Sequence, residues 1–358
     1  MLPEDVQDMI RSENENKRIT IADIAEELGL STATVSNVIH GKTKKVSDET
    51  VRRVQELLEK RQYIPNMAGI LLAQNDSGII GVVVNQHEKY EMHALEDAFI
   101  ASSLNNLSAE IEQAGKFMMV KTATRLETII QFASMWNMEG LVLIGFCQQD
   151  YVWLRQHMRI PFVAYDIEPG GTERFCNLSI DNFDGGFQVG QLFQRLGHER
   201  ALCIADNHIG VDYERYKGFR SGFGKERADF MEIPMLQKDR ARFYQERLEL
   251  LRAYTAVFAV SDYYAIDLIH FLMEQGIRVP QDISVAGFDD MPICSQFYPT
   301  ITSVRQDGKL RARTAMEKLM QLKSGEEQGS TLILPVQLVE RESTSYATAV
   351  ESNGIFRS

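Results

Sequence analysis

The stretch of residues 20–66 constrains the fold more than any other part of this chain. Its first part places apolar side chains at helical spacing, at Ile21, Ile24, Ala25 and Leu28. Gly29 then provides a residue that accepts the positive φ of a tight turn, and Ser31 provides a hydroxyl that can cap the next helix. Two short helices joined by such a turn form a helix-turn-helix, and we predict one here.

The second helix of this unit predicts a surface for DNA. Val35 and Val38 point back to the core, which leaves short and mostly polar side chains facing outward, at Thr32, Ala33, Ser36 and Asn37. Such side chains suit contact with base edges in the major groove. A third helix is expected from Asp48 to Gln62, with its own apolar stripe. The alternative is a small helical bundle without a role on DNA.

Charge supports the DNA role only weakly. The whole chain has a formal net charge of −12. Residues 17–66 carry nine basic and seven acidic side chains, and nine minus seven gives +2. A loop with Lys42, Lys44 and Lys45 suits phosphate contacts, although a solvated surface loop explains it equally well. Residues 1–18 form an acidic arm, to which we assign no role in DNA binding.

The remaining composition excludes several classes of protein. No apolar run approaches the length of a membrane span, and no export signal precedes the first helix, so we expect a cytoplasmic protein without a membrane partner. The four cysteines lie far apart and fit no metal spacing. His87 and His93 share a polar loop but form no larger cluster. We therefore expect neither a metal nor a cofactor.

After residue 66 the pattern changes to short apolar runs that alternate with amphipathic helices. Strands are predicted at 79–84, 117–120, 141–144, 162–165, 202–205, 257–260 and 284–288. Helices are predicted over 104–111, near 129 and 154, up to 196, near 217, and over 242–253 and 264–275. This alternation implies parallel sheets. We predict an all-α helix-turn-helix head and an α/β core of two doubly wound parallel-sheet subdomains, with a ligand cleft between them.

Motifs spread over the chain identify a family resemblance. The head carries Thr20-Ile21-x-Asp23-Ile24-Ala25, Ser31-x-x-Thr34-Val35-Ser36 and Tyr63-Ile64-Pro65-Asn66. The core carries Asp181-Asn182-x-x-Gly185-Gly186, Leu196-Gly197-His198, Gly287-Phe288-Asp289-Asp290 and Thr302-Ser303-Val304-Arg305-Gln306. With these motifs, residues 19–345 resemble the lactose-repressor/galactose-repressor family of bacterial transcription regulators.

The resemblance implies a homodimer that binds a pseudo-palindromic operator and holds a small effector in a core similar to periplasmic sugar-binding proteins. It implies base reading by Thr32, Ala33 and Asn37. Phosphate or backbone contacts are implied for Thr20, Ser31, Thr34, Tyr63 and Asn66. A hinge would become ordered on DNA, with Leu72 entering the minor groove. In the core, the resemblance implies effector contacts at Asp166, Arg215, Ser261, Asp289 and Gln306.

These expectations divide the chain into an acidic arm, a head, a hinge, a core and a tail, at 1–18, 19–64, 65–76, 77–345 and 346–358. Within the core, residues 77–180 with 307–325 are assigned to one subdomain, and residues 181–300 with 326–345 to the other. The dimer surface is expected on the C-terminal half, including the helix at 264–275, whose apolar stripe could equally belong to the core. No heptad repeat follows Ser345, so tetramerisation through a coiled coil is not expected.

Two residues depart from the family pattern in the DNA-binding part. Asn37 stands where arginine is frequent, and asparagine pairs with adenine rather than with guanine. Gly69 stands in the hinge where alanine is usual, and glycine costs a helix about 1 kcal/mol relative to alanine. We expect a Gly69→Ala variant to bind operator more tightly than the parent in a titration, and an equal or lower affinity would contradict this.

The effector is expected to differ from that of well-known members. Ser261 stands where sugar-binding members often have asparagine, and residues 230–235 lack a tryptophan. Two aspartates in one cleft disfavour a multiply anionic ligand. A neutral sugar or other polyol is the first expectation. A nucleobase or nucleoside is the second, with Tyr90, Phe99 or Phe183 as stacking rings. Both induction and corepression fit the sequence.

Two rival classes remain. A ligand-binding protein without a role on DNA would leave the first 66 residues without a function. An enzyme would need a reactive motif, and the sequence has no phosphate loop, nucleophile elbow or metal set. Asp289 and Asp290 resemble a catalytic pair, but adjacent strand residues point to opposite faces. We therefore expect an allosteric regulator in which the cleft and the DNA-binding head are coupled in free energy.

Overall fold

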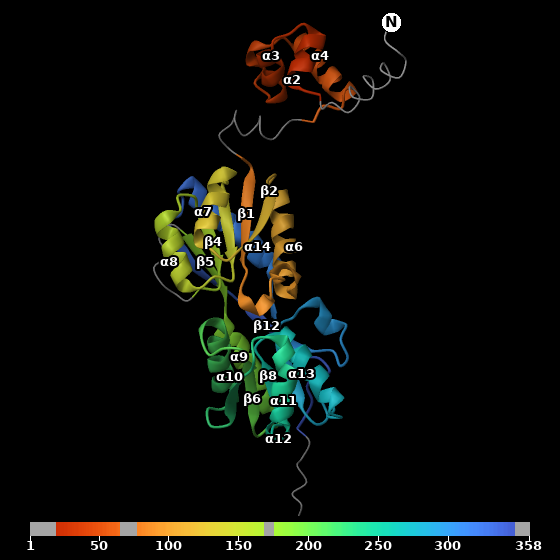
Figure 1. Cartoon of the computed structure of the whole chain (residues 1–358), viewed down its shortest axis with the longest axis vertical. Coiled ribbons are helices and arrows are strands. Elements are labelled where there is room, and N and C mark those ends of the chain that lie inside the picture. The colour runs from red at the N-terminus through yellow and green to blue at the C-terminus, as the bar shows by residue number, and fades with distance from the viewer. Residues whose placement is uncertain (1–18, 65–76, 168–174, 348–358) are drawn as a thin grey trace, which may run out of the picture. The chain divides into compact units, whose positions relative to one another are not determined.

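The computed structural model describes residues 19–64, 77–167 and 175–347 (Figure 1). The chain separates into two compact units, residues 1–75 and 76–358. The acidic arm, the predicted hinge with Leu72, and Asn66 lie outside the described residues.

Residues 19–64 of the first unit contain three α-helices, α2 (Ile21–Leu28), α3 (Thr32–Ile39) and α4 (Asp48–Lys60). Each begins at a hydroxyl residue, Thr20, Ser31 or Ser47, which accepts a hydrogen bond from a backbone N–H three residues on. Gly29 ends α2 at a φ of 66°, in the turn where positive φ was predicted. Their shared core consists of Ile24, Ala25, Val35, Val38, Val54 and Leu57. The helix-turn-helix is confirmed, and α4 ends two residues before the predicted Gln62.

The second unit contains two lobes, each with one six-stranded sheet (Figure 1). The first sheet is parallel throughout, in the order β11-β5-β4-β3-β1-β2. Its strands are β1 (Ile79–Asn85), β2 (Phe117–Ala123), β3 (Gly140–Ile144), β4 (Phe162–Tyr165), β5 (Phe175–Ile180) and β11 (Ser330–Leu334). One face packs against α6 (Ala98–Gln113) and α14 (Gly308–Ser324), and the other against α7 (Leu126–Met135) and α8 (Gln148–His157).

The second sheet has the order β12-β10-β9-β8-β6-β7, and β12 runs antiparallel to β10 at one edge. Its strands are β6 (Ala201–Ala205), β7 (Ala228–Glu232), β8 (Ala256–Ala259), β9 (Ser284–Asp289), β10 (Thr302–Gln306) and β12 (Val336–Val339). Its helices are α9 (Asn182–Arg195), α10 (Gly210–Phe223), α11 (Gln237–Glu246), α12 (Leu248–Leu251) and α13 (Asp262–Glu274). The predicted pair of α/β subdomains is thereby confirmed.

The chain passes between the lobes at three neighbouring points, at residues 180–182, 306–308 and 334–336. The N–H of Asp181 donates to the carbonyl of Leu334 at 2.9 Å, which joins the first crossing to the third. Gln306 is paired with Val336 in the β10–β12 ladder, which joins the second crossing to the third. Because β5 and β10 run into crossings at their carboxyl ends, these ends of both sheets face the space between the lobes.

Two predictions in the core were wrong. The helix expected at 242–253 is two helices, α11 and α12, with a break at Arg247. The segment 326–345 was assigned to the second subdomain, but its β11 pairs with β5 in the first sheet. The change of lobe therefore occurs at Pro335. Strands β5, β7, β10, β11 and β12 were not predicted, because polar residues interrupt their apolar ones.

The predicted apolar stripe on residues 264–275 belongs largely to the core. Of its members, Ile269 and Leu272 of α13 are fully buried in the core of the second lobe, and Ile266 is partly buried against it. Met273 is 45% exposed, so it is the member of the stripe that stays open to solvent.

Helices α9 and α10 pack with their backbones in contact through glycine. A Cβ added at Gly186 would lie 1.9 Å from the carbonyl oxygen of Arg215, and one added at Gly218 would lie 1.8 Å from that of Phe183. No side chain fits at such distances, so the close approach requires glycine. The packing brings Arg215 of α10 next to Asn182, the first residue of α9.

Candidate DNA-binding surface and effector cleft

Helix α3 presents the predicted base-reading side chains on its outer face. Thr32, Ala33 and Asn37 are exposed and Ser36 is half-buried, whereas Val35 is buried in the head. Among the described residues, no partner hydrogen-bonds the side chain of Asn37. Its amide can therefore offer both a donor and an acceptor to one base.

The hydroxyl residues predicted to contact phosphate already cap the helices. The hydroxyl of Thr20 donates to Asp23 at 2.7 Å, and the hydroxyls of Ser31 and Thr34 lie 2.8 Å apart. These bonds hold the hydroxyls at the amino ends of α2 and α3, where the helix dipole favours an anion. Their contact with phosphate stays a prediction, as does that of the half-buried Tyr63.

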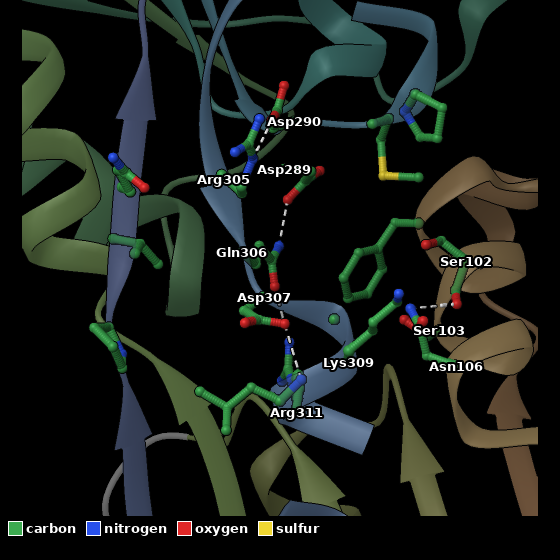
Figure 2. Close-up of a pocket in the computed structure, with 18 of the residues that line it drawn as sticks. Ser102, Ser103, Asn106, Asp289, Asp290, Arg305, Gln306, Asp307, Lys309 and Arg311 are labelled. Atoms are coloured by element: carbon green, nitrogen blue, oxygen red, sulfur yellow. Dashed lines mark hydrogen bonds and ion pairs between the residues drawn. The ribbon is translucent and has the colours of Figure 1, made fainter. Parts of the chain in front are cut away.

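A cleft of about 710 Å³ lies between the two lobes of the second unit (Figure 2). Helix α6 and the first turn of α14 line it from the first lobe. Strand β10 and the turn between β9 and the short helix η4 (Pro292–Ser295) line it from the second, and residues 335–337 of the third crossing also border it. Small-molecule sites commonly enclose roughly 300–1,000 Å³, so a sugar-sized or base-sized ligand fits this volume.

A chain of polar contacts runs along the cleft from one lobe to the other. The amide nitrogen of Gln306 donates to Asp289 at 2.6 Å, and its amide oxygen accepts from Arg311 at 3.1 Å (Figure 2). Arg311 in turn contacts Asp166 at 2.7 Å and donates to the carbonyl of Leu178 at 3.0 Å. The structure therefore connects Asp289, Gln306 and Asp166, three residues expected to contact the effector.

Arg215 joins this group from α10. Its guanidinium donates to Asn182 at 2.8 Å and to the carbonyl of Val260 at 2.6 Å, and it lies 3.8 Å from Asp289. It also lies 3.7 Å from the ring centroid of Phe288. These contacts fix a buried charge beside Asp289, as a cleft that orients a polar ligand requires.

Ser261 stands apart from this group. Its hydroxyl accepts a hydrogen bond from the N–H of Tyr264 and caps α13. The neighbouring Asp262 accepts from the hydroxyl of Ser303 at 2.5 Å and from the N–H of Met291 at 2.8 Å. These bonds fix the start of α13 and the turn after β9. An effector contact of Ser261 stays a prediction.

The turn after β9 is held in an unusual backbone conformation. Asp289 has a φ of 111° and Asp290 a φ of 50°, both uncommon for residues other than glycine. Arg305 and Arg341 each contact the carboxylate of Asp290 at 2.6 Å, and Ser303 accepts from its N–H. The surrounding bonds thus stabilise the strained turn that directs Asp289 into the cleft.

The protonation of Asp289 gives a testable dependence of stability on pH. Burial raises the pKa of Asp289 to about 8, against the lowering effect of Arg215 and with a further rise from Asp262. Between about pH 4 and 8 the folded protein holds a proton that the unfolded chain releases, so this group's contribution to stability falls as the pH rises.

We expect an Asp289→Asn variant to lose less stability than the parent between about pH 6 and 8. The difference should be roughly 1–2 kcal/mol, because asparagine keeps the shape and cannot ionise. Urea unfolding at both pH values measures it, with the exposed Asp239→Asn on α11 as a control for surface charge. Equal pH profiles for the parent and Asp289→Asn would contradict the prediction.

The structure adds two residues to this polar network that sequence reasoning did not assign, and of these Arg311 lines the cleft. Arg311 completes the polar chain, and Asn182 positions Arg215. Asn182 belongs to a quoted motif, so a signal existed for it. Arg311 has none, because α14 reads as an ordinary amphipathic helix. Of the rings predicted to stack on a base, Phe99 lines the cleft, whereas Phe183 lies on α9 with its ring near Phe187.

Two features are absent from the part of the chain that the structure describes. None of its helices is long and apolar enough to cross a membrane. Within the same part of the chain, no group of three or more histidine, cysteine, aspartate or glutamate side chains could hold a metal ion. His87 instead accepts from the N–H of Lys89, and His93 contacts Glu96 at 2.9 Å.

The head and the two-lobed core together define a DNA-binding regulator with a periplasmic-binding-protein-like domain. The sequence model for "Bacterial regulatory proteins, lacI family" matches residues 20–66. The model for "Periplasmic binding protein-like domain" matches residues 191–344. The head thus matches the lacI family of bacterial regulatory proteins, and the chain is similar to transcriptional regulators over nearly its full length.

Relatives and solved structures cover almost the whole chain. The transcriptional regulator MalR of Clostridium butyricum is 27% identical over 91% of this chain and 99% of its own length. The transcriptional repressor PurR of Erwinia tasmaniensis is 28% identical over 91% of this chain and 97% of its own. The lac repressor dimer bound to operator and the anti-inducer ONPF has the same fold, with a TM-score of 0.78 and 24% identity over 92% of this chain and 100% of its own. The regulator CelR in complex with cellobiose has a TM-score of 0.65 and is 24% identical, over 91% of this chain and 100% of its own.

Proposed function

We propose that this chain is a homodimeric transcription regulator, most simply a repressor, whose operator binding is controlled by a small neutral effector in the cleft. The observation that carries the proposal is the combination of a capped recognition helix, α3, with a two-lobed core that holds a polar cleft of ligand size. The transcriptional regulators MalR and PurR match this chain over nearly their full lengths, which supports the same role here.

The charges of the cleft support a neutral effector. Its lining carries the carboxylates of Asp290 and Asp307, and three cations, Arg305, Lys309 and Arg311. The third acid, Asp289, has a raised pKa of about 8 and is therefore mostly protonated at neutral pH. Most of these are already engaged within the protein, because Arg305 pairs with Asp290 and Arg311 pairs with Asp166. A multiply charged ligand would have to break such pairs, whereas hydroxyl groups can share them. The cellobiose complex of CelR supports a sugar, and a purine remains the second candidate.

The two aspartates after β9 support a binding role rather than catalysis. Asp289 bonds to Gln306, whereas Asp290 pairs with Arg305 and Arg341, so the two carboxylates have separate partners. A general acid and base acting on one substrate would need to converge on the same atoms. We therefore infer that the cleft binds its ligand without turnover.

Operator selection from random duplex DNA tests the proposal with the full chain. We expect two related half-sites arranged with two-fold symmetry, since a dimer presents two copies of α3. A thermal-shift screen of neutral sugars and nucleosides should find a ligand that raises the melting temperature by roughly 5–10 °C at 100 times its Kd.

Deletion of residues 1–76 provides the matched control. The shortened chain should lose operator binding and keep the thermal shift, because the two lobes do not depend on the head for their cores. Failure to enrich any DNA sequence would contradict the regulator. Chemical turnover of a bound ligand would instead support an enzyme.

A further inference from the structure

Arg311 reaches the cleft from the first turn of α14 but is almost fully buried, with 2% of its surface exposed. Its guanidinium is held by Gln306, by the carbonyl of Leu178 and by Asp166, at 3.1, 3.0 and 2.7 Å. A guanidinium is planar and its donors diverge at fixed angles. Three partners on three different elements therefore fix both the position and the plane of this group.

The fixed guanidinium covers an aromatic surface of the cleft. Its central carbon lies 4.0 Å from the ring centroid of Tyr165 and 6.0 Å from that of Phe99, and both rings line the same cleft. A purine that stacked on Tyr165 would need this face at a similar distance. Arg311 already occupies this face, so a planar ligand cannot stack on it.

Arg311 also fixes the orientation of a polar side chain that lines the cleft. It holds the amide oxygen of Gln306 while Asp289 holds the amide nitrogen, so the orientation of this amide is fixed (Figure 2). It also pairs with Asp166, which lies outside the lining of the cleft and whose second oxygen accepts from Ser179. On the α6 side, the lining adds the short polar side chains Ser102, Ser103 and Asn106. Fixed amides and hydroxyls match the hydroxyl groups of a polyol better than the flat face of a base.

We propose that Arg311 is the specificity-determining residue of the cleft, which selects hydroxyl-rich ligands and excludes stacked heterocycles. The inference rests on the proposed function, because it concerns the ligand of the same cleft. It assigns to one residue the choice between the two effector classes that the rest of the chain leaves open.

The test compares the full-length parent with Arg311→Ala, using hypoxanthine as the planar probe and ribose, cellobiose and maltose as polyol probes. Calorimetric titration measures each Kd. In the variant, hypoxanthine should bind about tenfold or more tightly than in the parent, because one face of Tyr165 becomes free. Any probe sugar that the parent binds should bind about tenfold more weakly, because Gln306 and Asp166 lose their common donor.

Arg313→Ala is the matched control, because Arg313 lies on the same helix with its side chain 68% exposed. This control should leave every Kd unchanged. Arg311→Lys keeps the charge near Asp166 without a planar face, so it should shift the hypoxanthine-to-sugar ratio in the same direction by a smaller factor. It serves as the second variant if Arg311→Ala gives an altered near-ultraviolet circular dichroism spectrum.

The outcomes separate this inference from the proposed function. If the parent binds none of the three sugars, the change in hypoxanthine affinity still decides the role of Arg311. The inference would be overturned if the ratio of hypoxanthine affinity to sugar affinity were unchanged in both variants. It would also be overturned if the parent bound hypoxanthine as tightly as Arg311→Ala does. Failure to select any operator would count against the regulator and would leave these ratios unaffected.

Discussion

Replacing Gly186 with alanine is expected to lower the stability of the core by more than about 3 kcal/mol, because the new Cβ would meet a backbone oxygen at 1.9 Å. That oxygen belongs to Arg215 on α10 and cannot rotate away as a side chain could. The two helices must separate, and Arg215 must then leave Asn182 and Val260. Urea unfolding should show the loss, and the variant should also lose its thermal response to any effector.

Gln191→Ala is the appropriate control for this prediction. Gln191 lies on the same helix with an exposed side chain, so its replacement should change the free energy of unfolding by less than about 0.5 kcal/mol. A Gly186→Ala variant as stable as this control would show that the backbones of α9 and α10 are not in the close contact described.

Replacement of Asn37 is expected to change which operator the protein selects. In a selection with the parent, the base pair that Asn37 reads should carry adenine, since an amide pairs bidentately with that base. Asn37→Ala should weaken binding to the selected operator by about 1–3 kcal/mol, or roughly 5- to 150-fold. Asn37→Arg should return guanine at the same position.

Gln55→Ala on α4 is the control for the Asn37 variants. Gln55 is exposed and lies outside the recognition helix, so its loss should leave the selected sequence unchanged. If Asn37→Arg selected the same base as the parent, Asn37 would have no role in base recognition.

The fold could be predicted where local rules and tertiary packing agree. Gly29, Ser31 and the apolar stripe of α2 determine the turn and the cap with few alternatives, and the structure has both. Prediction failed for the third crossing at Pro335, since the partner of β11 depends on pairing with the distant β5 rather than on its own residues. Arg247 similarly divides a helix that its apolar spacing presents as continuous.

The cleft was predictable only in part, for a related reason. Asp289 and Gln306 belong to motifs, and the structure bonds them to each other. The motif of residues 181–186 was recognised without an explanation, which the structure now provides. Asp181 caps α9, Asn182 holds Arg215, and Gly186 permits the contact with α10. Arg311 could not be found in this way, because two of its three partners, Leu178 and Asp166, lie far from it in sequence.

The three neighbouring crossings restrict how the lobes can move relative to each other. Hydrogen bonds and ladder pairing join them into one band, from Asp181 to Leu334 and from Gln306 to Val336. Two bodies joined along a continuous band can rotate about it, but sliding would break its bonds. Any ligand in the cleft therefore acts mainly on a single coordinate, the opening angle. Because each lobe is assembled from separate stretches of chain, neither can be exchanged between relatives as one uninterrupted gene fragment.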